Sequence, residues 1–215
     1  MIVIKPSYKI INEPDWDKLA AGIEEVARTC YQSHDRTKEG SADIMIRNLI
    51  SRQHEAMLEF ADMTVRFTCD RGVSHELVRH RHCSFAQEST RYVKYDGEME
   101  FVLPCWVGEK FLGPCSGAKL VFDNPEDIWI MTCKNIEVEY KSLLRHGWAP
   151  QQARSILPNS LKTKINMKTN IRDWRHILSL RCDKTAHPQM RELMIPLYNE
   201  LVEKCPVIFD SVEFS

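Results

Sequence analysis

Residues 63–69 have the sequence Met-Thr-Val-Arg-Phe-Thr-Cys, which alternates strictly between apolar and polar side chains. Because successive side chains of a β-strand point to opposite faces of a sheet, this alternation predicts a half-buried strand. Asp70 follows directly, and aspartate is a preferred N-cap residue of helices. We therefore expect a strand that leads straight into a helix, with Val73, Leu77 and Val78 on the apolar side of that helix.

The rest of the chain predicts more helices than strands. Further strands are expected at residues 1–4, 101–103 and 160–168. Apolar residues at helical spacing predict helices at residues 15–32, 43–53, 125–144, 150–157, 172–180 and 188–203. Asn124 before Pro125 is a favourable helix start, and Gly147 is a suitable helix end. Residues 108–125 have the weakest pattern and are expected to form a loop.

Length and composition bound the possible functions. The chain of 215 residues contains no repeat or Gly/Ser linker, which predicts one compact, mixed α/β domain over residues 1–215. The formal net charge of -1 gives no global indication of nucleic-acid or membrane binding. No segment has the roughly 18 apolar residues of a membrane span, and residues 1–16 lack the apolar core of a secretory signal. The eight cysteines include no Cys-x-x-Cys, which predicts reduced thiols and a cytoplasmic location.

Residues 79–92, Arg-His-Arg-His-Cys-Ser-Phe-Ala-Gln-Glu-Ser-Thr-Arg-Tyr, concentrate cationic and hydroxyl side chains. Arginine presents a planar fork of donors that suits a phosphate or an enolate oxygen. If the preceding helix continued, Arg79 and Arg81 would lie about 200° apart and could not bind one phosphate together. Either the helix ends here or the two arginines serve different ligands. The alternative to an anion site is a solvated basic surface.

Two other chemistries fit these residues poorly. Four potential metal ligands lie close in sequence: His75, His80, His82 and Cys83. Their spacing does not suit zinc, and no Cys-x-x-Cys or His-Glu-x-x-His accompanies them, so we expect no metal site. Cys105 and Cys115 each follow a proline, but neither has a neighbouring cation and base that would activate a nucleophilic thiol.

Charged side chains also stand beside apolar ones elsewhere in the chain. His54 and two glutamates lie within residues 52–59, between an expected helix and an expected strand. Arg154 is on a short, mostly apolar helix, and an arginine in that setting needs a partner. Arg172 and Arg181 are close to apolar residues, and Arg181 ends an apolar run from which a guanidinium can reach a pocket. Each of these features alone is also compatible with a structural ion pair or a polar helix end.

The stretch 79–92 resembles the signature of the flavin-dependent thymidylate synthases. That signature is Arg-His-Arg, seven residues, Ser, one residue and Arg-Tyr, and here Arg79-His80-Arg81 is followed by Ser89, Arg91 and Tyr92. The resemblance extends over roughly residues 20–200. Its other matching segments are Ala27–Tyr31, His54-Glu55 with Glu59, Arg154 to Pro158, Asn170-x-Arg172 and Leu180-Arg181.

The resemblance implies a fold and a reaction. The fold would be a single α/β domain with a central, mostly antiparallel sheet flanked by helices. The reaction would be the reductive methylation of dUMP to dTMP, with methylenetetrahydrofolate as carbon donor and FAD carrying hydride from NADPH. The assembly would be a homotetramer with active sites shared between chains, and the partners would be small molecules, with no nucleic acid and no membrane. Sharing would let Arg79 and Arg81 serve ligands of different protomers.

The family's site residues can be carried over by position. The residues that would contact FAD are His54, Ala56, Arg79, His80, Arg81, Gln87, Asn170, Ile171, Arg172 and His176. The residues that would line the dUMP pocket are Glu76, Leu77, Val78, Arg79, Gln87, Glu88, Ser89, Thr90, Arg91, Arg154 and Arg181.

Two of these residues would bear on catalysis. Arg181 would lie against the uracil and stabilise negative charge on the ring, which favours hydride attack. Ser89 would bind and orient the nucleotide. Because the sequence shows no histidine–acid pair that would activate Ser89, we do not expect this serine to be a nucleophile.

The chain departs from the family pattern at three positions of the stretch. Ala86-Gln87 replaces the common Asn-Glu, so either Glu88 supplies the acid or Gln87 forms hydrogen bonds without a charge. Thr90 replaces a common glycine.

Two rival functions are a nucleic-acid-binding module that uses the basic segment 71–92, and a methyltransferase with a nucleophilic cysteine at Cys105 or Cys115. The even balance of charge and the lack of interleaved aromatic residues argue against the nucleic-acid module.

Overall fold

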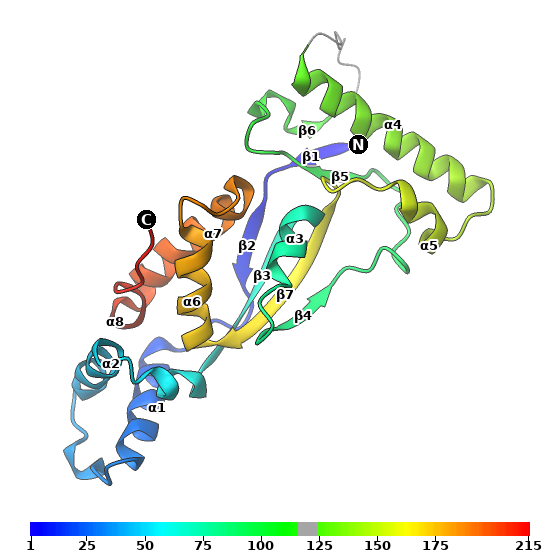
Figure 1. The fold of residues 1–215 in the computed structure, drawn as a ribbon. Coiled ribbons are helices and arrows are strands. Elements are labelled where there is room, and N and C mark those ends of the chain that lie inside the picture. Colours follow the sequence, from blue (N-terminus) through cyan, green and yellow to red (C-terminus); the bar gives the residue numbers. More distant parts are fainter. Residues whose placement is uncertain (116–123) are drawn as a thin grey trace. The chain divides into compact units, whose positions relative to one another are not determined.

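The computed structural model describes residues 1–115 and 124–215 (Figure 1). The strands are β1 (Ile2–Ile4), β2 (Ser7–Ile10), β3 (Asp62–Asp70), β4 (Ser84–Gln87), β5 (Glu100–Val102), β6 (Gly113–Pro114) and β7 (Lys162–Asn170). The α-helices are α1 (Trp16–Thr29), α2 (Ser41–Ser51), α3 (Arg71–Leu77), α4 (Pro125–Arg145), α5 (Pro150–Ala153), α6 (Ile171–Cys182), α7 (Pro188–Lys204) and α8 (Pro206–Phe209). Four short 3-10 helices complete the described elements: η1 (His34–Arg36), η2 (Glu55–Phe60), η3 (Glu109–Phe111) and η4 (Arg154–Ile156).

The described strands form two sheets. The three-stranded sheet has the order β5-β1-β6, with β1 parallel to β5 and antiparallel to β6. The four-stranded sheet has the order β2-β3-β7-β4. The mixed α/β fold class with mostly antiparallel strands and flanking helices is therefore confirmed.

The described chain divides into two compact units. Unit 1 comprises Met1–Ser7, Phe67–Arg79 and Phe85–Ile165, and unit 2 comprises Tyr8–Arg66, His80–Ser84 and Asn166–Ser215. The long strands β3 and β7 each contribute residues to both units. That the whole chain is a single domain stays a prediction.

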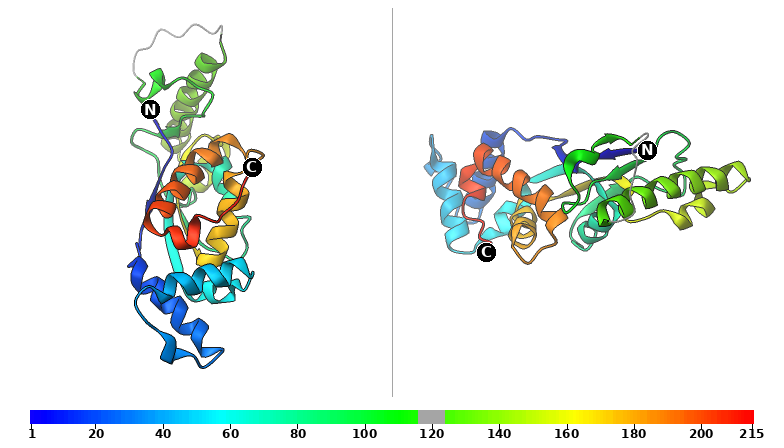
Figure 2. Two further views of the ribbon diagram at one scale, coloured as in Figure 1. Left: turned by 90° about the vertical axis from the view of Figure 1, so that its left-hand side faces the viewer. Right: turned by 90° about the horizontal axis from the view of Figure 1, so that it is seen from above.

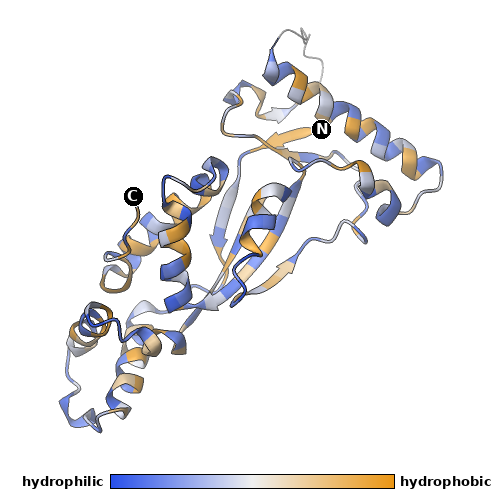
Figure 3. Ribbon diagram, viewed as in Figure 1, coloured by the Kyte–Doolittle hydropathy of each residue, from blue (hydrophilic) through white to orange (hydrophobic). Residues whose placement is uncertain are grey.

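Each unit has its own apolar core. In unit 1, β1 and β5 pack with α4 around the fully buried Phe101 and Tyr140; β1 is uniformly apolar, whereas α4 alternates apolar and polar stripes (Figure 3). In unit 2, α1 packs against α2, and α6 against α7 (Figure 2). Trp174 of α6 is fully buried there, and its indole Nε1 donates to the Met63 carbonyl at 3.0 Å.

The junction of β3 and α3 forms as its sequence predicts. The four apolar side chains of β3 at odd positions are fully buried. The Asp70 carboxylate accepts the Val73 amide at 2.7 Å and so caps α3. The helix ends at Leu77, however, and the Val78 amide bonds back to the Ser74 carbonyl. The helix therefore ends before residues 79–92, which is the first of the two alternatives considered for Arg79 and Arg81.

The other helices form where their sequence patterns predict them, whereas several short elements were not predicted from the sequence. Asn124 caps α4 as expected, accepting the Asp127 amide at 2.9 Å, and Gly147 ends that segment with a φ of 89°. Strands β2, β4 and β6 and helix α8 are additional elements that the sequence patterns did not indicate. Part of the loop expected at 108–125 forms η3 and β6, and its residues 116–123 lie outside the described part.

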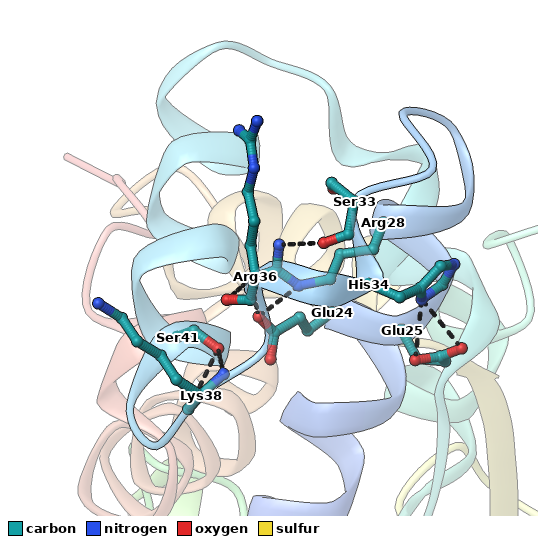
Figure 4. A network of polar contacts seen from close by, with 8 residues as sticks. All are labelled: Glu24, Glu25, Arg28, Ser33, His34, Arg36, Lys38 and Ser41. Atoms are coloured by element: carbon teal, nitrogen blue, oxygen red, sulfur yellow. Dashed lines mark hydrogen bonds and ion pairs between the residues drawn. The ribbon is translucent and has the colours of Figure 1, made fainter.

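A buried ion pair fixes the connection between α1 and α2 (Figure 4). The Arg28 guanidinium bonds to the Glu24 carboxylate at 2.5 Å, and both side chains are about 5% exposed. Arg28 also donates to the carbonyls of Ser33 and Arg36 at 3.0 and 3.1 Å. One guanidinium therefore satisfies a buried carboxylate and two loop carbonyls.

Among the described residues, no helix is long and apolar enough to cross a membrane.

Candidate functional site

The Arg-His-Arg segment occupies the turn between α3 and β4. Because α3 ends at Leu77, Arg79 follows the helix C-terminus, and its amide bonds to the Glu76 carbonyl at 3.1 Å. The Cys83 amide bonds to the His80 carbonyl at 3.2 Å, which closes a tight turn. Arg79 belongs to unit 1, whereas His80 and Arg81 belong to unit 2. The constraint that separated the two arginines on a continued helix therefore does not apply.

The residues expected to bind dUMP fall in unit 1, with the exception of Arg181. The Arg154 guanidinium of η4 donates to the Thr90 hydroxyl at 3.5 Å, which brings an arginine distant in sequence to the segment that follows β4. The Ser89 hydroxyl accepts the Arg91 amide at 3.3 Å. Arg79 and Arg91 are both exposed. Unit 1 thus carries three arginines and a serine hydroxyl within the expected nucleotide set.

Gln87 and Glu88 have different surroundings. The Gln87 amide nitrogen donates to the hydroxyls of Ser74 and Thr163 at 2.9 and 3.2 Å, and both hydroxyl residues are fully buried. Position 87 therefore forms hydrogen bonds without a charge. The Glu88 carboxylate lies 3.4 Å from the Lys162 ammonium, which also contacts Glu100 at 3.0 Å. No pattern in the sequence predicted Lys162 as the partner of Glu88.

Burial opposes the charge of Lys162, but the carboxylates of Glu100 and Glu88 raise its pKa above the ordinary value. Tyr95 stands in the same surroundings, where burial, with the nearby Glu88, raises its pKa to about 12. The Glu88 Oε2 atom is buried and has no hydrogen-bond partner among the described residues. Within the described part of unit 1, the Glu88 carboxylate is thus paired with Lys162 through one of its two oxygens.

The residues expected to bind FAD fall in unit 2, with the exceptions of Arg79 and Gln87. Most of them lie on or next to α6 and η2, two elements that pack together. His80 and Arg81 lie instead in the turn before β4. The Arg172 guanidinium bonds to Glu59 of η2 at 2.5 Å, and this contact raises the pKa of Arg172 further. His54 precedes η2 and Ala56 lies within it.

Asn170 has a structural role that its expected contact with FAD does not describe. It is the N-cap of α6, where its side-chain oxygen accepts the Asp173 amide at 2.8 Å. Its amide nitrogen also donates to the Asp173 carboxylate at 3.2 Å. Two further residues of the expected sets, Ile171 and Leu77, are fully buried.

A pocket of about 430 Å³ opens along α6 in unit 2. Its lining combines two arginines, a histidine and three acidic side chains with two serines and a valine: Arg172, Arg175, His176, Glu55, Asp173, Glu213, Ser179, Ser211 and Val212. Two of the residues expected to contact FAD, Arg172 and His176, therefore share one cavity. The pocket also adds side chains that the sequence analysis missed.

Arg175 is the most informative of the missed residues. Its guanidinium is about 9% exposed and lies 3.6 Å from the Glu55 carboxylate. It also donates to the Ile208 carbonyl and, at 3.2 Å, to the Ser211 hydroxyl. Burial lowers the pKa of Arg175, and its Nε atom has no hydrogen-bond partner among the described residues. The available signal was an arginine between the apolar residues Trp174 and Ile177 of the same helix.

Arg181 and His80, which are far apart in sequence, are in direct contact. The Arg181 Nε donates to His80 Nε2 at 3.0 Å. The carbonyl of His82 lies 3.3 Å from the Thr169 hydroxyl, which in turn lies 3.0 Å from the Asp173 carboxylate. The turn at residues 80–83 is therefore held against Arg181 of α6 and Thr169 near the end of β7.

The cysteines all lie among the described residues, and all eight are free thiols. The Cys115 thiol lies 3.4 Å from the Phe111 carbonyl and 3.7 Å from the Gly113 carbonyl, and it can donate to either. Within residues 1–115 and 124–215, no three His, Cys, Asp or Glu side chains are grouped so that they could hold a metal ion.

Comparison with known proteins assigns the family. The model of the thymidylate synthase complementing proteins matches residues 15–207, which is most of the chain. The protein therefore belongs to this family.

Its relatives define the family further. A flavin-dependent thymidylate synthase of Corynebacterium aurimucosum is 34% identical over 197 residues, which cover 87% of this chain and 78% of the relative. A flavin-dependent thymidylate synthase of Mycobacterium sp. (strain KMS) is 32% identical and covers 99% of this chain and 89% of the relative. The resemblance found in residues 79–92 is thereby confirmed.

A solved structure has the same fold. It is the UMP/dUMP methylase PolB from Streptomyces cacaoi bound with 5-Br dUMP, which aligns with a TM-score of 0.74 over 98% of this chain and 96% of that chain. The identity is 23%, so this likeness concerns the fold alone.

Proposed function

We propose that this protein is a flavin-dependent thymidylate synthase that methylates dUMP reductively to dTMP. The observation that carries the proposal is the intact Arg-His-Arg…Ser-x-Arg-Tyr segment. Two arginines from elsewhere in the chain contact it, Arg181 at His80 and Arg154 at Thr90. Membership of the family and relatives named flavin-dependent thymidylate synthase support it. Methylenetetrahydrofolate is the proposed carbon donor and NADPH the proposed reductant.

The pocket along α6 suits one part of a flavin dinucleotide. Arg172, Arg175 and His176 offer cationic or neutral donors to a diphosphate, and arginine forks match phosphate oxygens. The buried Arg175 Nε has no hydrogen-bond partner among the described residues, so one donor there remains to be satisfied. Ser179 and Ser211 add hydroxyl groups to the same lining. The residues present therefore fit FAD, with Arg172 and His176 as its contacts.

The chain's own residues bind and polarise the nucleotide. Arg79, Arg91 and Arg154 would neutralise the dUMP phosphate, and the Ser89 hydroxyl would bind and orient it. In the structure the Ser89 hydroxyl accepts the Arg91 amide at 3.3 Å, an arrangement that suits a binding group rather than an activated nucleophile. FAD, when bound and reduced, supplies the hydride.

Arg181 would act on the uracil ring. A guanidinium beside the ring stabilises the negative charge that develops on its polar edge, because donors fixed in advance act at little reorganisation cost. Arginine is the side chain that proteins use as a fixed cation, and Arg181 would supply one here. Its role is thus electrostatic and needs no proton transfer.

The direct test is spectroscopic and chemical. Purified protein is supplied with FAD, and the flavin absorption band is recorded before and after NADPH, with and without dUMP. We expect a protein-bound band that bleaches with NADPH, and formation of dTMP once methylenetetrahydrofolate is present. Failure to bind FAD in excess would overturn the proposal.

A second variant set separates the rival with a nucleophilic cysteine. Cys105→Ala and Cys115→Ala should both retain dTMP formation if the flavin mechanism operates. Loss of the product in either variant, with flavin reduction intact, would favour a cysteine adduct.

We further propose a homotetramer with shared active sites, a cytoplasmic location that suits eight free thiols, and no nucleic-acid partner.

A further inference from the structure

Lys162 is the first residue of β7 and lies between two other strands of unit 1. A bridge between β5 and the residue before β7 brings Glu100 of β5 to one side of this lysine. On another side, the amide of Glu88, directly after β4, bonds to the Lys164 carbonyl at 3.0 Å. The Lys162 ammonium lies 3.0 Å from the Glu100 carboxylate and 3.4 Å from the Glu88 carboxylate. One ammonium group therefore connects β5 with the residue that follows β4.

This ammonium group has little access to water. The Lys162 side chain is 12% exposed, whereas Lys164, two residues further along the same face of β7, is exposed. The Glu88 Oε2 atom is buried and has no hydrogen-bond partner, so Lys162 is the one cation paired with Glu88 in the described part of unit 1. Removal of Lys162 would leave a partly buried carboxylate without compensation.

Glu88 begins the segment that carries the expected phosphate ligands. The Ser89 hydroxyl accepts the Arg91 amide at 3.3 Å, and the Ser89 carbonyl accepts the amides of residues 92 and 93 at 3.2 and 2.9 Å. The buried Thr90 accepts from the Arg154 guanidinium at 3.5 Å. The contacts of Ser89 are thus internal to the segment and do not attach it to the sheet. The backbone bond and the carboxylate of Glu88 provide that attachment.

We propose that Lys162 is a positioning residue that holds Ser89 and Arg91 in place for the nucleotide phosphate, acting through the carboxylate of Glu88. The inference rests on the proposed function, in which Ser89 and Arg91 bind dUMP. Lys162 itself would not contact the nucleotide, because its ammonium is engaged by two carboxylates. It also neutralises Glu88, a carboxylate next to the groups that receive a dianionic phosphate. The effect of Lys162 is therefore on dUMP binding and not on the flavin set, which is mainly in unit 2.

The affinity for dUMP, measured by calorimetric titration of the FAD-loaded protein, tests the proposal. Lys162→Met should raise the Kd and the KM for dUMP by about 10-fold, the size expected when one charge-assisted hydrogen bond to the phosphate is weakened. The kcat at saturating dUMP should stay within about twofold of the parent, since binding is then lost equally from substrate and transition state. Lys162→Arg keeps a cation and should stay within about threefold in Kd.

Lys164→Met is the matched control. It makes the same change of charge on the same face of β7, but the Lys164 side chain is exposed and only its carbonyl contacts Glu88. Its Kd for dUMP should equal that of the parent. Equal losses in Lys164→Met and Lys162→Met would mean that only net charge matters and would overturn the proposal. An equal loss of FAD and dUMP affinity in Lys162→Met would also overturn it, because a general structural role affects both.

Two acid variants show which contact of Lys162 matters. Glu88→Gln should raise the Kd for dUMP by about fivefold, and adding Lys162→Met should raise it little further, because both changes break the same contact. Glu100→Gln leaves the contact with Glu88 in place and should stay within about twofold of the parent. Losses that multiply in the double variant, or a larger loss in Glu100→Gln than in Glu88→Gln, would refute the inference. If Lys162→Met does not fold, the two acid variants decide the question by themselves.

A measurement without turnover separates this proposal from the proposed function. Hydrogen exchange followed by NMR reports the local opening of single amides. The amides of Tyr92 and Val93, which bond to the Ser89 carbonyl, should exchange about 10-fold faster in Lys162→Met than in the parent or in Lys164→Met. Unchanged exchange at both amides would contradict the inference even in an active enzyme. If the parent makes no dTMP while these amides respond as expected, the proposed function fails and the role of Lys162 in holding the segment stands.

Discussion

The charged side chains of this protein differ widely in their exposure to water. Arg28 and Glu24 are almost completely buried, and each satisfies the other (Figure 4). Arg47 forms a comparable contact with Asp210 at 3.0 Å, but its side chain is 55% exposed. Removing one partner of a buried pair leaves a charge without compensation, whereas an exposed charge is solvated by water.

Arg28→Met should therefore lower the free energy of unfolding by about 3 kcal/mol, because Glu24 would remain buried without its cation. Arg47→Met, the matched control, should change it by about 0.5 kcal/mol or less. Chemical denaturation followed by circular dichroism measures both. The double variant Glu24→Leu with Arg28→Met should recover part of the loss, and equal effects of the two arginine variants would contradict this account.

His80 links stability to pH at the same scale. Its pKa is about 4 in the folded protein, against an ordinary value of 6.5. Between these values the unfolded chain binds more protons at this position than the folded one, so stability is lost as pH falls from 6.5 towards 4. Stability curves of the parent and of His80→Gln, measured across this range, should differ in slope, with the shallower slope in the variant. Parallel curves would show that His80 does not carry the effect.

Residue-level predictions from the sequence succeeded where the chemistry was local. The N-caps Asp70 and Asn124 depend on a side chain and an amide three residues away, and both form. Arg175 and Lys162 depend on partners that only the fold brings near, Glu55 in one case and Glu88 in the other. Such pairs leave no periodic pattern in the sequence.

At the scale of elements, long amphipathic segments were predictable and short ones were not. β3 has nine residues with clear alternation, whereas β4 has four residues, Ser84–Gln87, with no buried position. Such a strand exists because β7 pairs with it, not because of its own residues. The early end of α3 also lacks a glycine or proline signal. The turn at 80–83, which contacts Arg181 of α6 and Thr169 of β7, replaces the helix there.

Asn170 tests whether an element or a ligand explains its position. Asn170→Ala removes the N-cap of α6 and should lower the free energy of unfolding by about 1 kcal/mol. Asn170→Ser retains a capping oxygen and should restore most of that loss. Thermal unfolding without FAD measures both variants. Equal destabilisation by the two substitutions would contradict capping as the role of Asn170 in stability.

The affinity of the same variants for FAD then separates the two roles. If Asn170 acts only through the cap, Asn170→Ser should bind FAD like the parent. Weaker binding by both variants would assign a direct contact to the amide group, in addition to the cap.

At the scale of the whole molecule, the expected site residues divide between the two units. The flavin set is mainly in unit 2, around α6 and η2, and the nucleotide set is mainly in unit 1, around Ser89 and Arg154. Sequence resemblance proposed both sets because their residues match the family's motifs by position. It could not assign them to separate units, since that division depends on where β3 and β7 pass from one unit into the other.

This division allows a test of active sites shared between chains. Arg154→Ala should weaken the nucleotide set and Arg172→Ala the flavin set, and each variant alone should form little dTMP. If a complete site takes the two sets from different copies, mixed oligomers of the two variants contain some sites with both arginines. Random mixing then restores about a quarter of the parental activity, since each arginine is present in half of the copies. The subunits are mixed under mild denaturation, and the product is measured by chromatography. No recovery in oligomers shown by mass to contain both variants would mean that one copy supplies both arginines to each site.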